Sequence, residues 1–289
     1  MEKHIFKFGN SSLAMILPKK WVTKNSLSGA SQIFMSENSK GDLVLSSKST
    51  QQTASVRTVN KRTSPELLSR FIYLYYLRGV ARLTINSPDG FMEAQIKAMQ
   101  HQITSYCPGF EITGQSTNEI KIEDLTNIRE IDIGKIVARL RSLINQEIAE
   151  VREGNAETAG RIEELVDRFY LLGIRYVNIV QPADAIKYYR TILIMENMAD
   201  DLLRIVSAKK TSPKLIDMIA KAFALSESGF AGDQNAIMET AALRRSAISA
   251  IDGSKMDPLY RKIFKGTITA CNQIAEFGLL EEDPKTIVY

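Results

Sequence analysis

The sequence predicts a multidomain α+β protein, and three observations lead to this fold class. Residues 1–50 contain short alternating apolar runs separated by turn signals, a pattern typical of small β-sheets. Residues 51–127 alternate between helix-like and strand-like segments. Residues 128–289 repeat apolar side chains at the three- and four-residue spacing of amphipathic helices. A chain of 289 residues has room for these three domains.

The first domain, residues 1–50, is expected to hold four short strands and one short helix. HIFKF and LAMIL read as strands around the turn signal at residues 9–12, and Pro18 ends the second strand. PKKWVTKNSL predicts a short helix, and QIFMSE and DLVLSS predict a hairpin turning at residues 38–41. A unit of this size buries little surface by itself, so it usually needs a partner chain.

The second domain, residues 51–127, is expected to be a small α+β unit. Residues 48–63 are polar and fit either a linker or a pairing strand. Ser64-Pro65 signals a helix start, VARLTI reads as a strand, and FMEAQIKAMQHQITSY reads as a second helix. FEITGQSTNEIKIEDL predicts a hairpin that turns near residues 116–118. The predicted order is therefore α-β-α-β-β.

The third domain, residues 128–289, is expected to contain two consecutive three-helix bundles, 128–210 and 211–289. Turn signals at residues 153–155, at Gln181-Pro182 and at Ser212-Pro213 separate amphipathic segments by short connections, which implies antiparallel neighbours. The segment around Gly154 resembles the segment around Gly232, which indicates an internal repeat.

Charge is distributed unevenly along the chain, which carries a net charge of +4. Residues 1–62 hold ten Lys and Arg against three Asp and Glu, whereas the remainder holds 27 against 30. A basic head on a mildly acidic body indicates contact with a polyanion, although a basic solubilising surface explains the charge as well.

Other sequence features narrow the class of protein. No apolar run approaches the roughly 20 residues needed to span a bilayer, and the start has no signal-peptide pattern, so we expect a cytoplasmic protein that is not inserted in the membrane. Two separated cysteines fit a reducing compartment. Phosphate-binding loops, HExxH and nucleophile-elbow motifs do not occur, so no enzyme activity is expected.

Two Glu-x-x-x-Asp pairs are the main candidate site. Glu163 and Asp167, and likewise Glu196 and Asp200, are four residues apart and therefore lie one helical turn apart on the same side. If the two helices are neighbours, four carboxylates can converge on a hard cation. On a helical wheel Glu163 and Asp167 lie well away from the apolar stripe, which fits both a surface metal site and a solvated helix face.

The second repeat serves as an internal control for these pairs. It retains the helical pattern but keeps only one of the four carboxylates, because the corresponding residues are Ala241, Arg245, Asn272 and Glu276. The helices therefore do not need the carboxylates in order to fold.

The two Glu-x-x-x-Asp pairs in consecutive helices resemble the motifs of the PhoU family of phosphate-uptake regulators. FGNSSLAMILPKKWV resembles the core of the SpoVT/AbrB swapped-hairpin domain. Together they resemble archaeal PhoU-type regulators with an N-terminal SpoVT/AbrB-like domain, over nearly the whole chain. The resemblance implies a head that forms a homodimer by interleaving strands and binds DNA, with contacts carried over to Lys7, Lys19, Lys20 and Lys24.

The same resemblance implies a function. The bundle would bind a metal ion, with iron, zinc and magnesium as candidates, through Glu163, Asp167, Glu196 and Asp200. It would dock on a phosphate transporter or a signalling protein, and the whole protein would act as a transcriptional regulator of phosphate uptake. The main alternative is an adaptor that never binds DNA and instead inhibits a membrane phosphate transporter; its head would then serve only for dimerisation. A third hypothesis is a regulator of another pathway with the same architecture.

Overall fold

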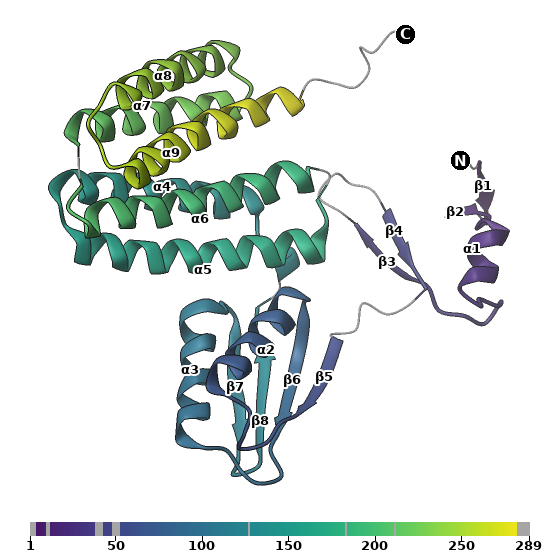
Figure 1. The fold of residues 1–289 in the computed structure, drawn as a ribbon. Helices are drawn as coiled ribbons and strands as arrows, with labels where there is room; N and C mark the ends of the chain where they lie inside the picture. Colours follow the sequence, from purple (N-terminus) through teal and green to yellow (C-terminus); the bar gives the residue numbers. More distant parts are fainter. Residues whose placement is uncertain are drawn as a thin grey trace. The chain divides into compact units, whose positions relative to one another are not determined.

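The structure is a computed structural model of the 289-residue chain, and it divides into two compact units, Met1–Thr53 and Ala54–Tyr289 (Figure 1). We refer to them as unit 1 and unit 2. The residues that the structure describes are 4–9, 12–37, 43–47, 53–126, 128–182, 184–210 and 212–281. Residues 10–11 and 38–41 of the predicted turns, and the polar residues 48–52, lie outside these ranges.

Unit 1 consists of two antiparallel hairpins and one short helix. In the first hairpin Ile5 lies opposite Met15, and in the second Phe34 lies opposite Ser46; the two hairpins belong to separate sheets. None of the residues of unit 1 whose side chains the structure describes is buried. The elements are β1 (Ile5–Phe8), β2 (Ser12–Met15), α1 (Lys19–Lys24), β3 (Phe34–Glu37) and β4 (Leu43–Ser46).

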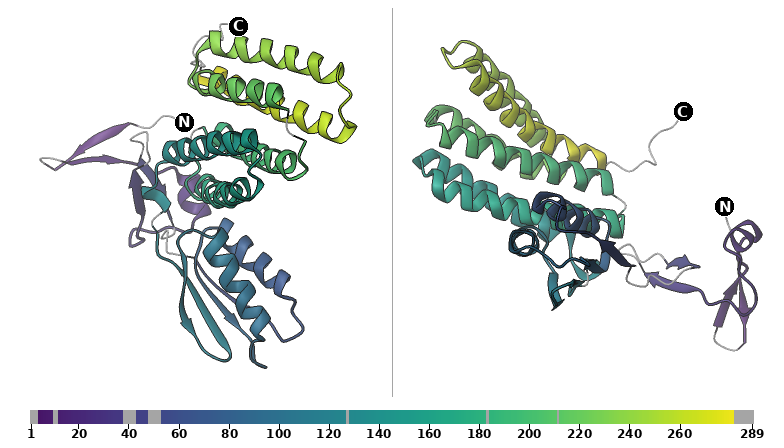
Figure 2. Two further views of the ribbon diagram at one scale, coloured as in Figure 1. Left: turned by 90° about the vertical axis from the view of Figure 1, so that its left-hand side faces the viewer. Right: turned by 60° about the horizontal axis from the view of Figure 1, so that its bottom comes forward.

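The first part of unit 2 is a four-stranded sheet in the order β5-β6-β8-β7, with α2 and α3 on one face (Figure 2). Residues 48–63, which fit either a linker or a strand in the sequence, contribute the edge strand β5. The sheet therefore begins one strand earlier than the predicted α-β-α-β-β order. The elements are β5 (Thr53–Thr58), α2 (Pro65–Leu77), β6 (Val80–Asn86), α3 (Glu93–Tyr106), β7 (Phe110–Gln115) and β8 (Glu119–Asp124).

The alternation of side chains along these strands determines which face of the sheet is covered. In β6 and β8 every second residue is buried, while Arg82 and Lys121 point to the open, polar face. Ser64 caps α2 by accepting a hydrogen bond from the amide of Leu67, and Pro65 occupies the first helical position. The resulting core joins helix and strand residues: Leu68, Ile72, Leu83, Ile85, Met99, Ile103, Ile120 and Ile122.

The second part of unit 2 is helical. The side chain of Asp132 caps α4 by accepting a hydrogen bond from the amide of Gly134, and Gly154 ends α4 in the left-handed conformation. Pro213 and Pro258 begin α7 and α9 at positions where a missing amide proton costs nothing. The helices are α4 (Ile133–Glu153), α5 (Ala156–Val180), α6 (Ala185–Ser207), α7 (Pro213–Phe230), α8 (Gln234–Asp252) and α9 (Pro258–Glu276).

These helices form two mutually packed sets of three, α4–α6 and α7–α9, and α6 also contacts α9 (Figure 1). The apolar stripes face a shared core in which Leu140, Ile144 and Leu202 are fully buried. Gly173 allows α5 to approach its neighbours closely, because a Cβ atom there would lie 2.7 Å from Ile192 Cδ1. Over the described residues, no helix combines the length and the apolar character that a membrane crossing requires.

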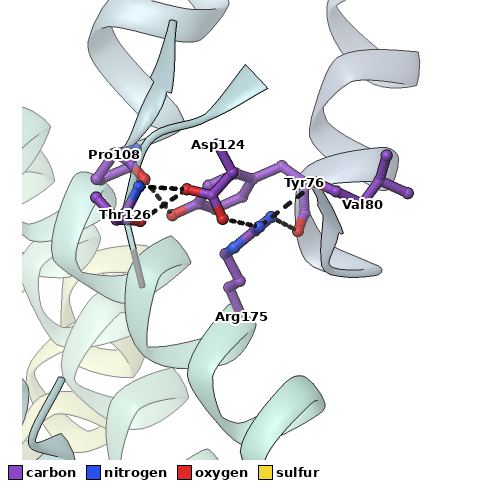
Figure 3. Close-up of polar contacts among 6 residues, drawn as sticks. All are labelled: Tyr76, Val80, Pro108, Asp124, Thr126 and Arg175. Atoms are coloured by element: carbon purple, nitrogen blue, oxygen red, sulfur yellow. Dashed lines mark hydrogen bonds and ion pairs between the residues drawn. The ribbon is translucent and has the colours of Figure 1, made fainter. Parts of the chain in front are cut away.

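Arg175 on α5 joins the helical part of unit 2 to the sheet (Figure 3). Its Nη2 lies 2.5 Å from Oδ2 of Asp124 at the end of β8, and its Nη1 donates to the carbonyl of Tyr76. The guanidinium also lies 4.4 Å from the centre of the Tyr76 ring and 5.1 Å from that of Phe110. Since Arg175 is almost completely buried, this ion pair is shielded from water.

Candidate carboxylate site and lysine surface

Helices α5 and α6 lie side by side and bring the two predicted pairs together. Glu163 and Asp167 lie one turn apart on α5, and Glu196 and Asp200 lie one turn apart on α6. All four side chains are partly buried. The helical wheel placed Glu163 and Asp167 on the solvated side of α5, and their partial burial corrects this placement. The reason is that α2 and α3 pack against α5, a contact that the periodicity of one helix does not reveal.

Burial and mutual repulsion raise the pKa values of three of these carboxyl groups, those of Glu163, Asp167 and Glu196. Burial, followed by the charges of Asp167 and Asp200, raises the pKa of Glu163 to about 7. Burial and Asp200 raise the pKa of Asp167 to about 6, and burial, Asp200 and Asp167 raise the pKa of Glu196 to about 7. The carboxyl groups therefore share one electrostatic environment, in which negative charge is in excess.

One cation neutralises part of this cluster. Nη2 of Arg204 lies 2.8 Å from Oδ2 of Asp200, and its Nη1 lies 3.2 Å from Oδ1 of Asp201. Within the described ranges, no three or more His, Cys, Asp or Glu side chains are arranged to hold a metal ion. The donor set consists of carboxylate oxygens and so suits a hard cation, but coordination would require the partly exposed side chains to rotate toward one another.

Glu147 on α4 is a fifth carboxyl group, which the sequence motifs did not reveal. It is completely buried, and neither carboxyl oxygen has a hydrogen-bond partner within the described residues. Burial and the nearby charges of Glu163 and Asp200 raise its pKa to about 9, so the group is protonated at neutral pH. Its position within the apolar stripe of α4, three residues after Ile144, is the sequence signal that could have identified it.

The second set of helices contains no comparable group of carboxylates among its described residues. Asn272, which replaces Glu196 in the repeat, is buried, and its Nδ2 donates to Oε1 of Glu276 at 2.6 Å. The side-chain amide of Asn272 thus provides a hydrogen-bond donor for Glu276, the one carboxylate that the second repeat retains. Among the described residues, the clustered carboxylates therefore belong to the first set.

Three tyrosines from different helices lie beside the carboxylates. Tyr73 on α2, Tyr106 on α3 and Tyr170 on α5 border a small pocket together with Asp167 and Glu196. Burial, followed by Tyr73 and Glu196, raises the pKa of Tyr170 to about 12, so its phenol remains neutral. The pocket forms only when α2 and α3 pack against α5, and sequence reasoning did not reveal it.

The four predicted DNA-contacting lysines all lie on the surface of unit 1. Lys7 is on β1, and Lys19, Lys20 and Lys24 are on α1. All four are exposed, and no carboxylate of the described residues pairs with them. The end of α1 is tied to the end of β4, because the hydroxyl of Ser47 donates to Oδ1 of Asn25 at 2.7 Å.

Apolar side chains are exposed in the same unit. Their exposed fractions range from 37% for Phe34 to 70% for Met35. This is a large apolar surface for a unit without a buried residue among those described. The exposed set is Ile5, Phe6, Phe8, Leu13, Met15, Ile16, Phe34, Met35 and Leu43.

Comparisons of the chain with protein-family models, with curated proteins and with solved structures found no match. The function is therefore inferred from the sequence patterns and from the geometry described above.

Proposed function

We propose that this protein is a DNA-binding transcriptional regulator of phosphate uptake that acts in the cytoplasm as a homodimer. Unit 1 would bind DNA, and the carboxylate-bearing helices would sense a metal ion or a partner protein. The observation that carries the proposal is the surface of unit 1, where four exposed lysines accompany uncovered apolar strands. The resemblance to PhoU regulators with a SpoVT/AbrB-like head is the reason for proposing phosphate uptake as the regulated process.

The uncovered strands support dimerisation. An isolated two-stranded hairpin is at best marginally stable in water, and unit 1 has two hairpins without a shared sheet. A second copy of unit 1 would cover residues such as Phe8 and Leu13 and would pair the free strand edges. The folded state of unit 1 would then depend on association with a second chain.

Replacing Phe8 with aspartate is expected to weaken dimerisation by at least about 100-fold, because an unpaired charge would be buried in the interface. Sedimentation equilibrium of the full chain at several concentrations would measure the monomer–dimer equilibrium. Val56→Asp is the matched control, since Val56 is 67% exposed on β5 of unit 2 and should leave the dimer unchanged. A dimer of unchanged affinity in Phe8→Asp would contradict the proposed role of the strands.

The lysines support contact with the phosphate backbone of DNA. An ammonium group is a compact point charge that suits a phosphate oxygen but offers little bidentate reading of bases. A dimer would present each lysine twice, so the symmetric surface would match two half-sites. Affinity dominated by such contacts decreases steeply as the salt concentration rises.

Reversing the charge of Lys19, Lys20 and Lys24 to glutamate is expected to reduce DNA affinity by about 100-fold or more. The slope of log affinity against log salt concentration should also become shallower by about 0.9 for each phosphate that the variant no longer neutralises. Fluorescence anisotropy would measure both, using the upstream region of the gene and unrelated DNA. The matched control reverses three exposed lysines of unit 2, Lys135, Lys214 and Lys221, and should retain most of the affinity.

The outcomes of this titration separate the two functional hypotheses. Preference of the wild type for the upstream region supports a transcriptional role for unit 1. If the wild type binds no DNA even at low salt, the DNA-binding proposal is wrong and the adaptor hypothesis replaces it, with unit 1 reduced to dimerisation.

The carboxylate cluster supports a sensing role for the helices. Glu163, Asp167, Glu196 and Asp200 would supply oxygen ligands, and a bound cation would favour their ionised forms over the protonated ones. A ligand changes DNA affinity only if it binds one arrangement of the protein better than another. Anisotropy titrations with and without iron, zinc and magnesium test this linkage, and equal DNA affinity in all of them would contradict it.

A further inference from the structure

A small pocket in unit 2 is lined by residues of α2, α3, α5 and α6. Its volume is about 240 Å³, below the roughly 300–1,000 Å³ of pockets that hold drug-sized ligands. Both parts of unit 2 contribute polar or aromatic lining residues: Tyr73, Gln102, Tyr106, Asp167, Tyr170 and Glu196. We call this site the tyrosine pocket.

The charge of the tyrosine pocket is negative and unbalanced. Asp167 and Glu196 form no ion pair with any described residue, and no lysine, arginine or histidine of the described chain lines the pocket. Arg204 is the cation that opposes the rise in the pKa of Glu196, but its guanidinium is already paired with Asp200 and Asp201. A ligand that fits these walls would therefore carry positive charge.

The tyrosines restrict the chemical class of that ligand. Tyr73, Tyr106 and Tyr170 supply aromatic rings and hydroxyl groups that have no hydrogen-bond partner within the part of the chain that the structure describes. Aromatic rings beside carboxylates attract alkylammonium ions, because the ring quadrupole and the carboxylate both favour a weakly hydrated cation. A bare metal ion gains little from the rings and is much smaller than the pocket.

We propose that the tyrosine pocket binds a small organic ammonium ion. Asp167 and Glu196 hold its charge, and its alkyl groups lie against the rings of Tyr73, Tyr106 and Tyr170. The test of this site does not depend on DNA binding by unit 1. Since α2, α3, α5 and α6 all contribute to the walls, the ligand stabilises the contact between the sheet layer and the helices.

Isothermal titration calorimetry of the full chain, dialysed against a chelator, tests the proposal with tetramethylammonium chloride as the probe. Sodium chloride at the same ionic strength is the reference. We expect saturable binding by the wild type. Glu196→Gln should weaken it about tenfold because the ligand loses one of its two counter-charges.

Two variants of Tyr73 distinguish the contribution of the aromatic ring to binding from that of the hydroxyl group. Tyr73→Leu should weaken binding about fivefold or more, whereas Tyr73→Phe retains the ring and should change it less than about threefold. The matched controls are Tyr75→Leu on the same helix and Glu157→Gln on α5, where Glu157 is 82% exposed; neither residue lines the pocket. Both controls should bind within about threefold of the wild type.

Several results would overturn the proposal. These are absence of saturable binding by the wild type, unchanged affinity in Glu196→Gln, or equal loss of affinity in Glu157→Gln and Glu196→Gln, which would indicate a diffuse acidic surface. Saturable binding of magnesium chloride but not of tetramethylammonium would show that the site belongs to a metal ion. If Tyr73→Leu fails to fold, as judged by circular dichroism, Tyr73→Phe and Glu196→Gln still decide the outcome.

Discussion

Replacing Arg175 with methionine is expected to destabilise unit 2 by about 3–5 kcal/mol, which is among the largest effects that a single side chain of this protein can have. The substitution removes the cation that pairs with Asp124, whose side chain is only 7% exposed. The buried carboxylate has lost hydration and would then have no counter-charge to compensate for that loss. Urea unfolding followed by circular dichroism would measure the loss of stability.

The rest of the Arg175 environment adds to this cost. The carbonyl of Tyr76 loses a charged donor, and the rings of Tyr76 and Phe110 lose the cation that lies over them. One oxygen of Asp124 would still accept hydrogen bonds from the amide and hydroxyl of Thr126, as Figure 3 shows, so the carboxylate would be held in place rather than released to solvent.

Two further variants make this prediction specific. Arg161→Met changes the same residue type on the same helix, but Arg161 and its partner Glu157 are 72% and 82% exposed, so the expected loss is below about 0.5 kcal/mol. The double variant Arg175→Met/Asp124→Asn removes both charges and should be more stable than Arg175→Met alone. A loss below about 1 kcal/mol in Arg175→Met would contradict the role assigned to the ion pair.

The elements of unit 2 that the sequence predicted best are those with a local cause. Ser64-Pro65 and Ser212-Pro213 mark helix starts because a proline at the first helical position, and at Ser64 also a side-chain cap, act through residues only a few positions away. The apolar stripe of α4 is buried because its spacing matches one turn of helix. The sequence did not decide whether the segment that contains β5 is a linker or a strand, because the segment is polar. Its pairing partner β6 follows only after an intervening helix, so the pairing has no local sequence signal.

The parts of the candidate site that the sequence did not reveal depend on contacts between elements. The spacing of Glu163 and Asp167 predicted a shared direction, but their partial burial depends on how α2 and α3 pack against α5. The same contact creates the tyrosine pocket. Arg175 lies outside the apolar stripe, and nothing in its local pattern indicates that it would be buried against Asp124.

Replacing Glu147 with glutamine is expected to stabilise unit 2 at neutral pH, which is unusual for a substitution in a core. The pKa of Glu147 is about 9 in the folded protein, against an ordinary value of 4.5. Between these two values the folded protein keeps a proton that the unfolded chain has released. Unfolding therefore releases a proton, and rising pH favours the unfolded state until the pH passes about 9.

The sign and size of this effect follow from proton linkage. The penalty from Glu147 is absent below pH 4.5 and grows by about 1.4 kcal/mol for each pH unit above it. Glutamine retains the shape and the unpaired polar atoms but cannot release a proton. The stability advantage of Glu147→Gln should therefore increase by about 3 kcal/mol between roughly pH 5.5 and pH 8.

Urea unfolding of chelator-treated protein at about pH 5.5 and about pH 8 would measure this difference, since a bound cation would otherwise compensate an ionised Glu147. Glu153→Gln is the matched control, because Glu153 is exposed near the end of the same helix and should change stability by only a few tenths of a kcal/mol at either pH. Equal stability differences for Glu147→Gln at both pH values would contradict a protonated core glutamate. A growing difference would mean that the acidic cluster costs the fold stability at neutral pH, which is expected of residues retained for binding rather than for folding.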